Sequence, residues 1–113
     1  MLNELLGATV TVTVDRPLGS RHPKFSDLVY TVNYGYIVGL IGGDGEAQDA
    51  YVLGVDRPLS EFTGRVIAII HRLDDVEDKL VVAPDGAVFT REQIVELTYF
   101  QERYFNSTVE AII

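Results

Sequence analysis

The sequence predicts a mainly β protein of the α+β class, in which short strands form a small barrel and one C-terminal helix lies against it. Two observations carry this prediction. Residues 8–14, ATVTVTV, alternate valine with threonine at a period of two, which is typical of a half-buried strand. Thr90 with Gln93 three residues later is a capping-box pair at a helix start. Apolar residues then recur at steps of three and four, so we expect a helix from Thr90 to Tyr104.

The remaining elements follow from apolar runs and turn residues. Pro17, Gly19 and Pro23 break the chain into a loop after the first strand. Further strands are predicted at residues 28–32, 36–41, 50–55, 65–71 and 79–83, with residues 33–35 as an interruption. The last three are continuous apolar runs, as expected of strands covered on both faces. The pentapeptide VDRPL occurs at 14–18 and at 55–59, which indicates one strand-to-turn junction used twice.

Length, composition and charge exclude several classes. The 113 residues are 47% hydrophobic and 23% charged, which predicts a single folded domain over residues 1–113. The net charge of −8 argues against nucleic acid as a partner, because binding to phosphate backbones needs a basic face. No apolar run approaches the roughly 20 residues that span a bilayer, so no membrane role is expected. With no cysteine and no leader, we expect a cytoplasmic protein.

Two acidic segments interrupt the apolar strands. The first, GGDGEAQDAYVL at 42–53, places Asp44, Glu46 and Asp49 on a glycine-rich bend, and the second, DDVEDK, covers 74–79. Crowded carboxylates repel one another unless a cation lies among them, and carboxylate oxygens suit Mg²⁺, Mn²⁺ or Ca²⁺. The alternative is that both segments are solvated turns that keep strand edges soluble. The residue types alone leave the two interpretations open.

Three motifs in this order resemble the soluble inorganic pyrophosphatases, whose fold is an OB-type barrel. They are NYGYI at 33–37, the frame DGxxxD at 44–49, and DDVEDKLVVAP at 74–84; YFQERY at 99–104 is similar to that family's C-terminal helix. The resemblance extends from about Thr11 to Tyr104. It implies a five-stranded, OB-like barrel and Mg²⁺-dependent hydrolysis of pyrophosphate to two phosphates.

The resemblance also implies roles for individual residues. Asp44, Asp49 and Glu77 match metal ligands, Asp74 lies near a further ligand position, and Asp78 could substitute for Glu77. Glu46 stands at the position of the general base. Phosphate-binding positions match Tyr34, Lys79 and Tyr104, and Asp15 aligns with a glutamate beside the metal ions. For the two tyrosines, a simple packing role is the alternative.

The sequence departs from the family pattern in its basic residues and in its central motif. Glu46 replaces a shorter aspartate, Phe105 stands where the family has a lysine, and an N-terminal hairpin with a lysine and an arginine is absent. Only the loop RPLGSRHPK at 16–24 could replace that hairpin, with Arg21 and Lys24 as the candidate phosphate ligands.

Three function classes therefore stay open. The first is a Mg²⁺-dependent pyrophosphatase, for which Mn²⁺ is a second suitable metal. The second is a weak or inactive homologue that binds metal-complexed phosphate or a nucleotide. The third is a structural or partner-binding barrel. The apolar end at 109–113, VEAII, is expected to pack on the barrel or on another subunit, which leaves a homo-oligomer open.

Overall fold

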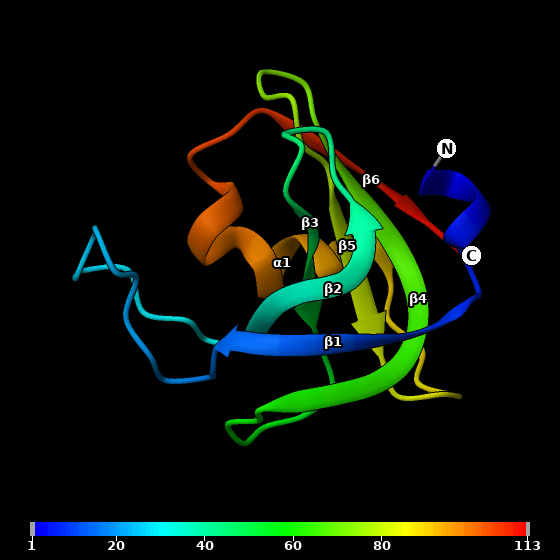
Figure 1. Cartoon of the computed structure of the whole chain (residues 1–113), viewed down its shortest axis with the longest axis horizontal. Coiled ribbons are helices and arrows are strands. Elements are labelled where there is room, and N and C mark those ends of the chain that lie inside the picture. The colour runs from blue at the N-terminus through cyan, green and yellow to red at the C-terminus, as the bar shows by residue number, and fades with distance from the viewer. Residues whose placement is uncertain (1, 113) are drawn as a thin grey trace.

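Five strands close into a barrel in the computed structural model, which describes residues 2–112 (Figure 1). In chain order the elements are η1 (Leu2–Leu5), β1 (Thr9–Arg16), β2 (Asn33–Ile41), β3 (Ala47–Val52), β4 (Glu61–Arg72), β5 (Lys79–Ala83), α1 (Arg91–Glu102) and β6 (Ser107–Ala111). The strand order is β1-β2-β3-β5-β4, and β4 pairs with β1 to close the barrel. Only the β3–β5 pair is parallel. The predicted mainly β fold, a five-stranded barrel with a helix, is confirmed.

The buried side chains form two clusters, one inside the barrel and one under the helix. The inner cluster takes residues from all five barrel strands, among them Val12, Ile69 and Leu80. The outer cluster includes Val81 from the other face of β5 and Ile94 from α1. Successive residues of a strand point to opposite faces. After Lys79, the residues of β5 are all apolar because the strand is buried on both sides, as predicted.

Helix α1 begins as the sequence predicts. The Thr90 hydroxyl accepts a hydrogen bond from the Gln93 amide at 3.1 Å, and the Gln93 side chain accepts one from the Thr90 amide at 2.8 Å. The helix ends at Glu102, two residues before the predicted Tyr104, with Arg103 as its C-cap. Within the described residues, no helix combines the length and apolar character that a membrane span requires.

Three segments differ from the expected strand pattern. Residues 28–32 form no strand, and only one isolated bridge, Arg21 with Val29, joins this part of the loop. Residues 33–35, expected as an interruption, belong to β2. Gly35 allows this because a Cβ there would lie 1.9 Å from the Thr13 carbonyl oxygen on β1. Strand β6 was not predicted; it pairs with β4, so the C-terminal segment packs on the barrel as far as Ala111. Ile113 lies outside the described residues.

One buried asparagine organises both copies of VDRPL. The Asn33 side-chain oxygen accepts hydrogen bonds from the backbone amides of Leu18 at 2.9 Å and Leu59 at 3.0 Å. Its amide nitrogen donates to the Arg57 carbonyl oxygen at 2.9 Å. Both repeated segments therefore contact the same side chain at the start of β2. The expected strand-to-turn junction is seen only in the first copy, which leaves β1, because the second copy lies wholly in the loop between β3 and β4.

Candidate functional site

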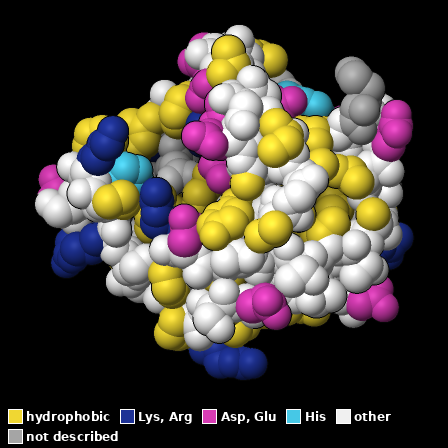
Figure 2. Space-filling view, in the orientation of Figure 1, with side chains coloured by type: hydrophobic (Ala, Val, Ile, Leu, Met, Phe, Trp, Pro, Cys, Tyr) yellow, Lys and Arg dark blue, Asp and Glu magenta, His cyan; other side chains and the backbone are white. Residues whose placement is uncertain are grey.

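A pocket of about 630 Å³ opens between the barrel, the loop of residues 17–32 and the C-terminal end of α1. Its charged lining residues are Asp15, Arg16, Asp27, Asp49, Arg72 and Lys79. Its aromatic lining residues are His22, Phe25, Tyr30, Tyr34, Tyr104 and Phe105. Figure 2 shows a hollow beside this loop, with acidic side chains gathered along its wall. Charged groups and aromatic rings thus share one concave site.

The charged part of the pocket is built around the ammonium of Lys79. Lys79 is only 2% exposed, and its Nζ donates to Asp49 Oδ2 at 2.7 Å and also to Glu77. The Tyr34 hydroxyl donates to the same Asp49 oxygen at 2.7 Å. Burial lowers the pKa of Lys79, and the Asp49 charge opposes this shift. Burial and the Asp49 charge raise the pKa of Tyr34, so its hydroxyl stays a donor.

Sheet pairing brings these four residues together. Strands β3 and β5 are parallel with Ala50 opposite Leu80, which places Asp49 beside Lys79. Strand β2 pairs with β3 in antiparallel register with Tyr36 opposite Asp49, so Tyr34 lies one diagonal step away on the same face. Four residues predicted for the site therefore do meet: Tyr34, Asp49, Glu77 and Lys79. Asp78, the alternative to Glu77, instead lies against His71, with Oδ2 2.9 Å from Nδ1.

Asp15 and Arg16 enter the pocket at an irregularity of β1. The β1–β2 register shifts between Val14 and Arg16, as in a β-bulge, so the side chains at the end of the strand are redirected. Partial desolvation and the nearby Asp49 charge raise the pKa of Asp15, against the opposing effect of Arg16. The Arg16 guanidinium donates to the Tyr30 hydroxyl at 2.8 Å.

A chain of hydrogen bonds that was not predicted lies beneath the pocket. The Tyr30 hydroxyl donates to the side-chain oxygen Oε1 of Gln101 at 2.7 Å, and the side-chain nitrogen Nε2 of Gln101 donates to the Tyr51 hydroxyl at 2.8 Å. Tyr51 then donates to Glu102 at 2.6 Å. Each link joins α1 to a barrel strand or to the loop. The signal for these partners was weak, because Gln101 and Glu102 look like ordinary polar residues of a helix end.

Arg72 completes this network and brings a positive charge to the pocket. Its guanidinium makes two hydrogen bonds to the Glu102 carboxylate, at 3.0 Å and 2.7 Å, and one to Asp75 at 3.1 Å. The Phe105 ring lies over the guanidinium, 3.6 Å from its central carbon. Phe105 stands where the resemblance implies a lysine. The cation on this wall of the pocket therefore comes from β4 and not from the segment after α1.

Four predicted acidic residues do not line the pocket: Glu77, which contacts Lys79, and Asp44, Glu46 and Asp74. Asp44 and Glu46 are exposed on the β2–β3 turn, where the Asp44 carboxylate accepts the Glu46 amide at 3.0 Å. Asp74 accepts the Asn106 amide at 3.1 Å. The two acidic segments do lie against each other, because a Cβ at Gly43 would be 2.0 Å from the Val76 carbonyl oxygen. Backbone contact joins the segments, while the Asp44 carboxylate closes its own turn and the Asp74 carboxylate holds the segment after α1.

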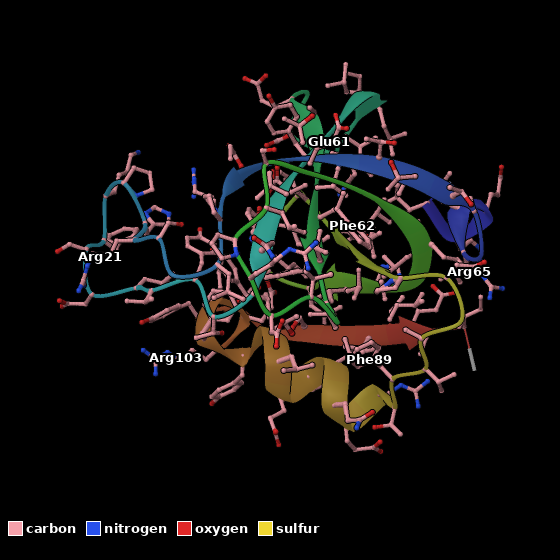
Figure 3. The ribbon with its side chains drawn as sticks, turned by 90° about the horizontal axis from the view of Figure 1, so that it is seen from below. Arg21, Glu61, Phe62, Arg65, Phe89 and Arg103 are labelled. Atoms are coloured by element: carbon pink, nitrogen blue, oxygen red, sulfur yellow. The ribbon has the colours of Figure 1, made fainter. Side chains whose placement is uncertain are left out.

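The basic loop contributes different residues from those predicted. The Arg21 guanidinium donates to the Ser26 carbonyl oxygen at 2.7 Å, and neither Arg21 nor Lys24 lines the pocket. Figure 3 shows Arg21 at the outer end of the loop. His22, Phe25 and Asp27 line the pocket instead. Tyr104, the remaining predicted residue, lines the pocket with 60% of its surface exposed.

Few carboxylates near the pocket lie close enough together to act as ligands of a divalent cation. Within residues 2–112, no group of three His, Cys, Asp or Glu side chains is close enough to hold a metal ion. Mg²⁺, however, is usually held by one or two carboxylates and completes its shell with waters and phosphate oxygens. Asp49 and Glu77 already converge on one cationic nitrogen. This pair fits Mg²⁺ that arrives with a phosphate ligand, and Mn²⁺ suits the same oxygen donors.

Comparison with known proteins supports the fold. No protein-family model and no curated protein sequence matches the chain. Among solved structures, an inorganic pyrophosphatase from Ehrlichia chaffeensis superposes with a TM-score of 0.72 and 16% identity, covering 95% of this chain and 88% of that one. One from Neisseria gonorrhoeae gives a TM-score of 0.65 and 18% identity, covering 100% and 88%. The chain therefore has the fold of the soluble inorganic pyrophosphatases over nearly its whole length.

Proposed function

We propose that this protein hydrolyses inorganic pyrophosphate to two phosphates in a Mg²⁺-dependent reaction. One observation carries the proposal: Tyr34, Asp49 and Lys79 converge in the pocket of a chain with this fold. Glu77 does not line the pocket but contacts the same Lys79 ammonium. The structures that share the fold are inorganic pyrophosphatases, and the pocket offers both carboxylates for a divalent cation and donors for phosphate oxygens.

The charges around the pocket support the need for a divalent cation. Asp49 and Glu77 carry two negative charges against one positive charge on Lys79. Glu102 and Asp75 likewise carry two negative charges against the one positive charge on Arg72. This surplus repels a free pyrophosphate anion more strongly than its Mg²⁺ complex, because the cation cancels two of the anion's negative charges. We therefore expect the metal complex to bind more tightly than free pyrophosphate.

The proposed roles follow from these contacts. Asp49 and Glu77 would hold Mg²⁺, which when bound neutralises phosphate charge and makes a coordinated water more acidic. Lys79, Tyr34 and Arg16 donate hydrogen bonds and would orient phosphate oxygens. Tyr104 at the rim can donate its hydroxyl to a second phosphate group. The buried network under Arg72 keeps this wall of the pocket rigid.

The proton acceptor is the weakest part of the expected site. Glu46, which stands at the general-base position, is exposed on its turn and does not line the pocket. Asp15 does line it, and its pKa is raised, which makes its carboxylate a better base. We propose Asp15 as the proton acceptor, and Glu46 stays the candidate that the resemblance implies.

The test is phosphate release from pyrophosphate by the purified protein, with and without Mg²⁺. Asp49→Asn should lower kcat/KM at least about 100-fold, because it removes charge from the cation site. Asp85→Asn, an exposed aspartate outside the pocket, is the matched control and should have wild-type kinetics. Asp15→Asn and Glu46→Gln, assayed across pH, separate the two candidate bases. No release at saturating Mg²⁺ would refute the proposal.

A second candidate is a protein that binds Mg²⁺-complexed phosphate without turnover. The exposed position of Glu46, together with the pairing of Asp49 and Glu77 to Lys79, favours it. Calorimetric binding of Mg²⁺-pyrophosphate without phosphate release would support this candidate. Absence of both binding and release would leave the structural role. A homo-oligomer stays a prediction, for which light scattering is the measurement.

A further inference from the structure

The pocket is larger than pyrophosphate requires. Its volume of about 630 Å³ lies within the range of roughly 300–1,000 Å³ typical of pockets that bury drug-sized ligands. Pyrophosphate consists of two phosphoryl groups and would occupy only the charged part near Lys79. The aromatic part of the pocket would then stay open to solvent.

That second part is bounded by exposed aromatic side chains from two segments. Phe25, in the loop of residues 17–32, is 63% exposed, and Tyr104, after α1, is 60% exposed. Both line this pocket. Exposed aromatic rings that gather at one cavity mark a candidate surface for a ligand.

A row of aromatic rings connects the rim to the charged part. Phe25 lies 5.0 Å from His22, and the His22 ring is nearly parallel to Tyr30, with centroids 6.4 Å apart and planes at 12°. Tyr30 lies 5.5 Å from Tyr34, whose hydroxyl contacts Asp49. Burial, Arg16 and Lys24 lower the pKa of His22, which keeps this ring neutral at pH 7. The row offers ring faces at one end and phosphate donors at the other.

Polar groups along this wall indicate what kind of ring-bearing ligand fits. Arg16, Asp27 and Gln101 also line the pocket. Gln101 already bonds to Tyr30 and Tyr51, so Arg16 and Asp27 are the polar groups that a ligand would meet. An alkyl chain would desolvate these groups without giving them hydrogen bonds, which is costly. A ribose offers hydroxyls to them, and a nucleobase stacks on the aromatic faces.

We propose that the pocket binds the Mg²⁺ complex of a nucleoside diphosphate or triphosphate, with its phosphates at Lys79 and its base on Phe25 and Tyr104. This inference rests on the proposed function for the placement of the phosphates. It extends the proposed ligand from pyrophosphate to a phosphoanhydride that carries a nucleoside.

The experiment is calorimetric titration with Mg²⁺-ADP, Mg²⁺-pyrophosphate and Mg²⁺-geranyl diphosphate. ADP should bind at least about ten-fold more tightly than pyrophosphate, since a base–aromatic stack contributes an affinity factor of that order or more. Phe25→Ala and Tyr104→Ala should each weaken ADP binding about ten-fold. Tyr99→Ala is the matched control, because Tyr99 is 58% exposed on α1 and lies outside the pocket. Melting temperatures check that each variant is folded.

The outcomes separate the two proposals. Hydrolysis of pyrophosphate without tighter binding of ADP overturns the nucleotide inference and leaves the proposed function standing. ADP binding that depends on Phe25 and Tyr104, without any phosphate release, overturns hydrolysis and supports the nucleotide site. Tighter binding of geranyl diphosphate than of ADP, or an equal loss in Tyr99→Ala, overturns the nucleotide inference.

Discussion

Replacing Lys79 with methionine removes the cation on which Asp49 and Glu77 converge, while keeping a side chain of similar length in the buried space. Removing one partner of a fully buried ion pair costs about 3–5 kcal/mol. Here the remaining carboxylates are 31% and 18% exposed, so water solvates them partly. We therefore expect a loss of roughly 2–3 kcal/mol in the free energy of unfolding. For 113 residues this corresponds to a fall in Tm of roughly 8–13 °C.

The same variant tests the cation site directly. Without the ammonium, two carboxylates face each other unpaired, so Lys79→Met should bind Mg²⁺ more tightly than wild type. If the Mg²⁺ concentration is ten times the dissociation constant, the variant regains about 1.4 kcal/mol by mass action. The assay is urea denaturation followed by circular dichroism, with and without millimolar Mg²⁺.

Lys24→Met is the control for this experiment, because Lys24 is the other lysine and is exposed. It should lose less than about 0.5 kcal/mol. A loss below about 1 kcal/mol in Lys79→Met would contradict the assignment of Lys79 as the counter-charge of the site. Equal stabilisation of wild type and variant by Mg²⁺ would contradict competition between Lys79 and the cation, and no stabilisation of the variant would contradict the binding of a divalent cation by Asp49 and Glu77.

Two further predictions concern stability. Hydrogen bonding to Glu110 and Asp78 raises the pKa of His71 despite partial burial. Protonated His71 therefore stabilises the fold fully below its ordinary pKa of 6.5, and this stabilisation is lost as the pH rises through the raised pKa. His71→Gln should flatten this part of the stability–pH profile measured in urea, and an unchanged slope would contradict the assignment. Glu102→Gln leaves the Arg72 guanidinium, in a side chain only 6% exposed, with Asp75 as its remaining charged partner, and should cost about 2–4 kcal/mol in thermal or urea unfolding. Arg103→Met is the control, because Arg103 is exposed and follows Glu102 directly, and it should cost less than about 0.5 kcal/mol.

Parts of the site could be predicted from the family resemblance, which names Tyr34, Asp49 and Lys79. The apolar patterns alone do not bring them together, because Tyr34 falls in an expected interruption and Asp49 lies just before an expected strand. In the structure β2 and β3 include them, and sheet pairing places them beside Lys79. The roles of Asp44, Glu46 and Asp74 depend on turn conformations that periodicity does not specify. In the structure these carboxylates lie on exposed turns, where two of them accept backbone amides, and their proposed functions stay predictions.

The sequence by itself determined the barrel strands, the capped start of α1 and the carboxylate-rich strand ends, because each rests on local periodicity or on a motif of a few residues. Only the tertiary structure decided which side chains share the pocket. Arg72, Gln101 and Glu102 come from β4 and α1, and Tyr30 comes from a loop without regular structure. Their network forms through contacts between segments far apart in the chain, where packing and the need to pair buried polar groups select the partners.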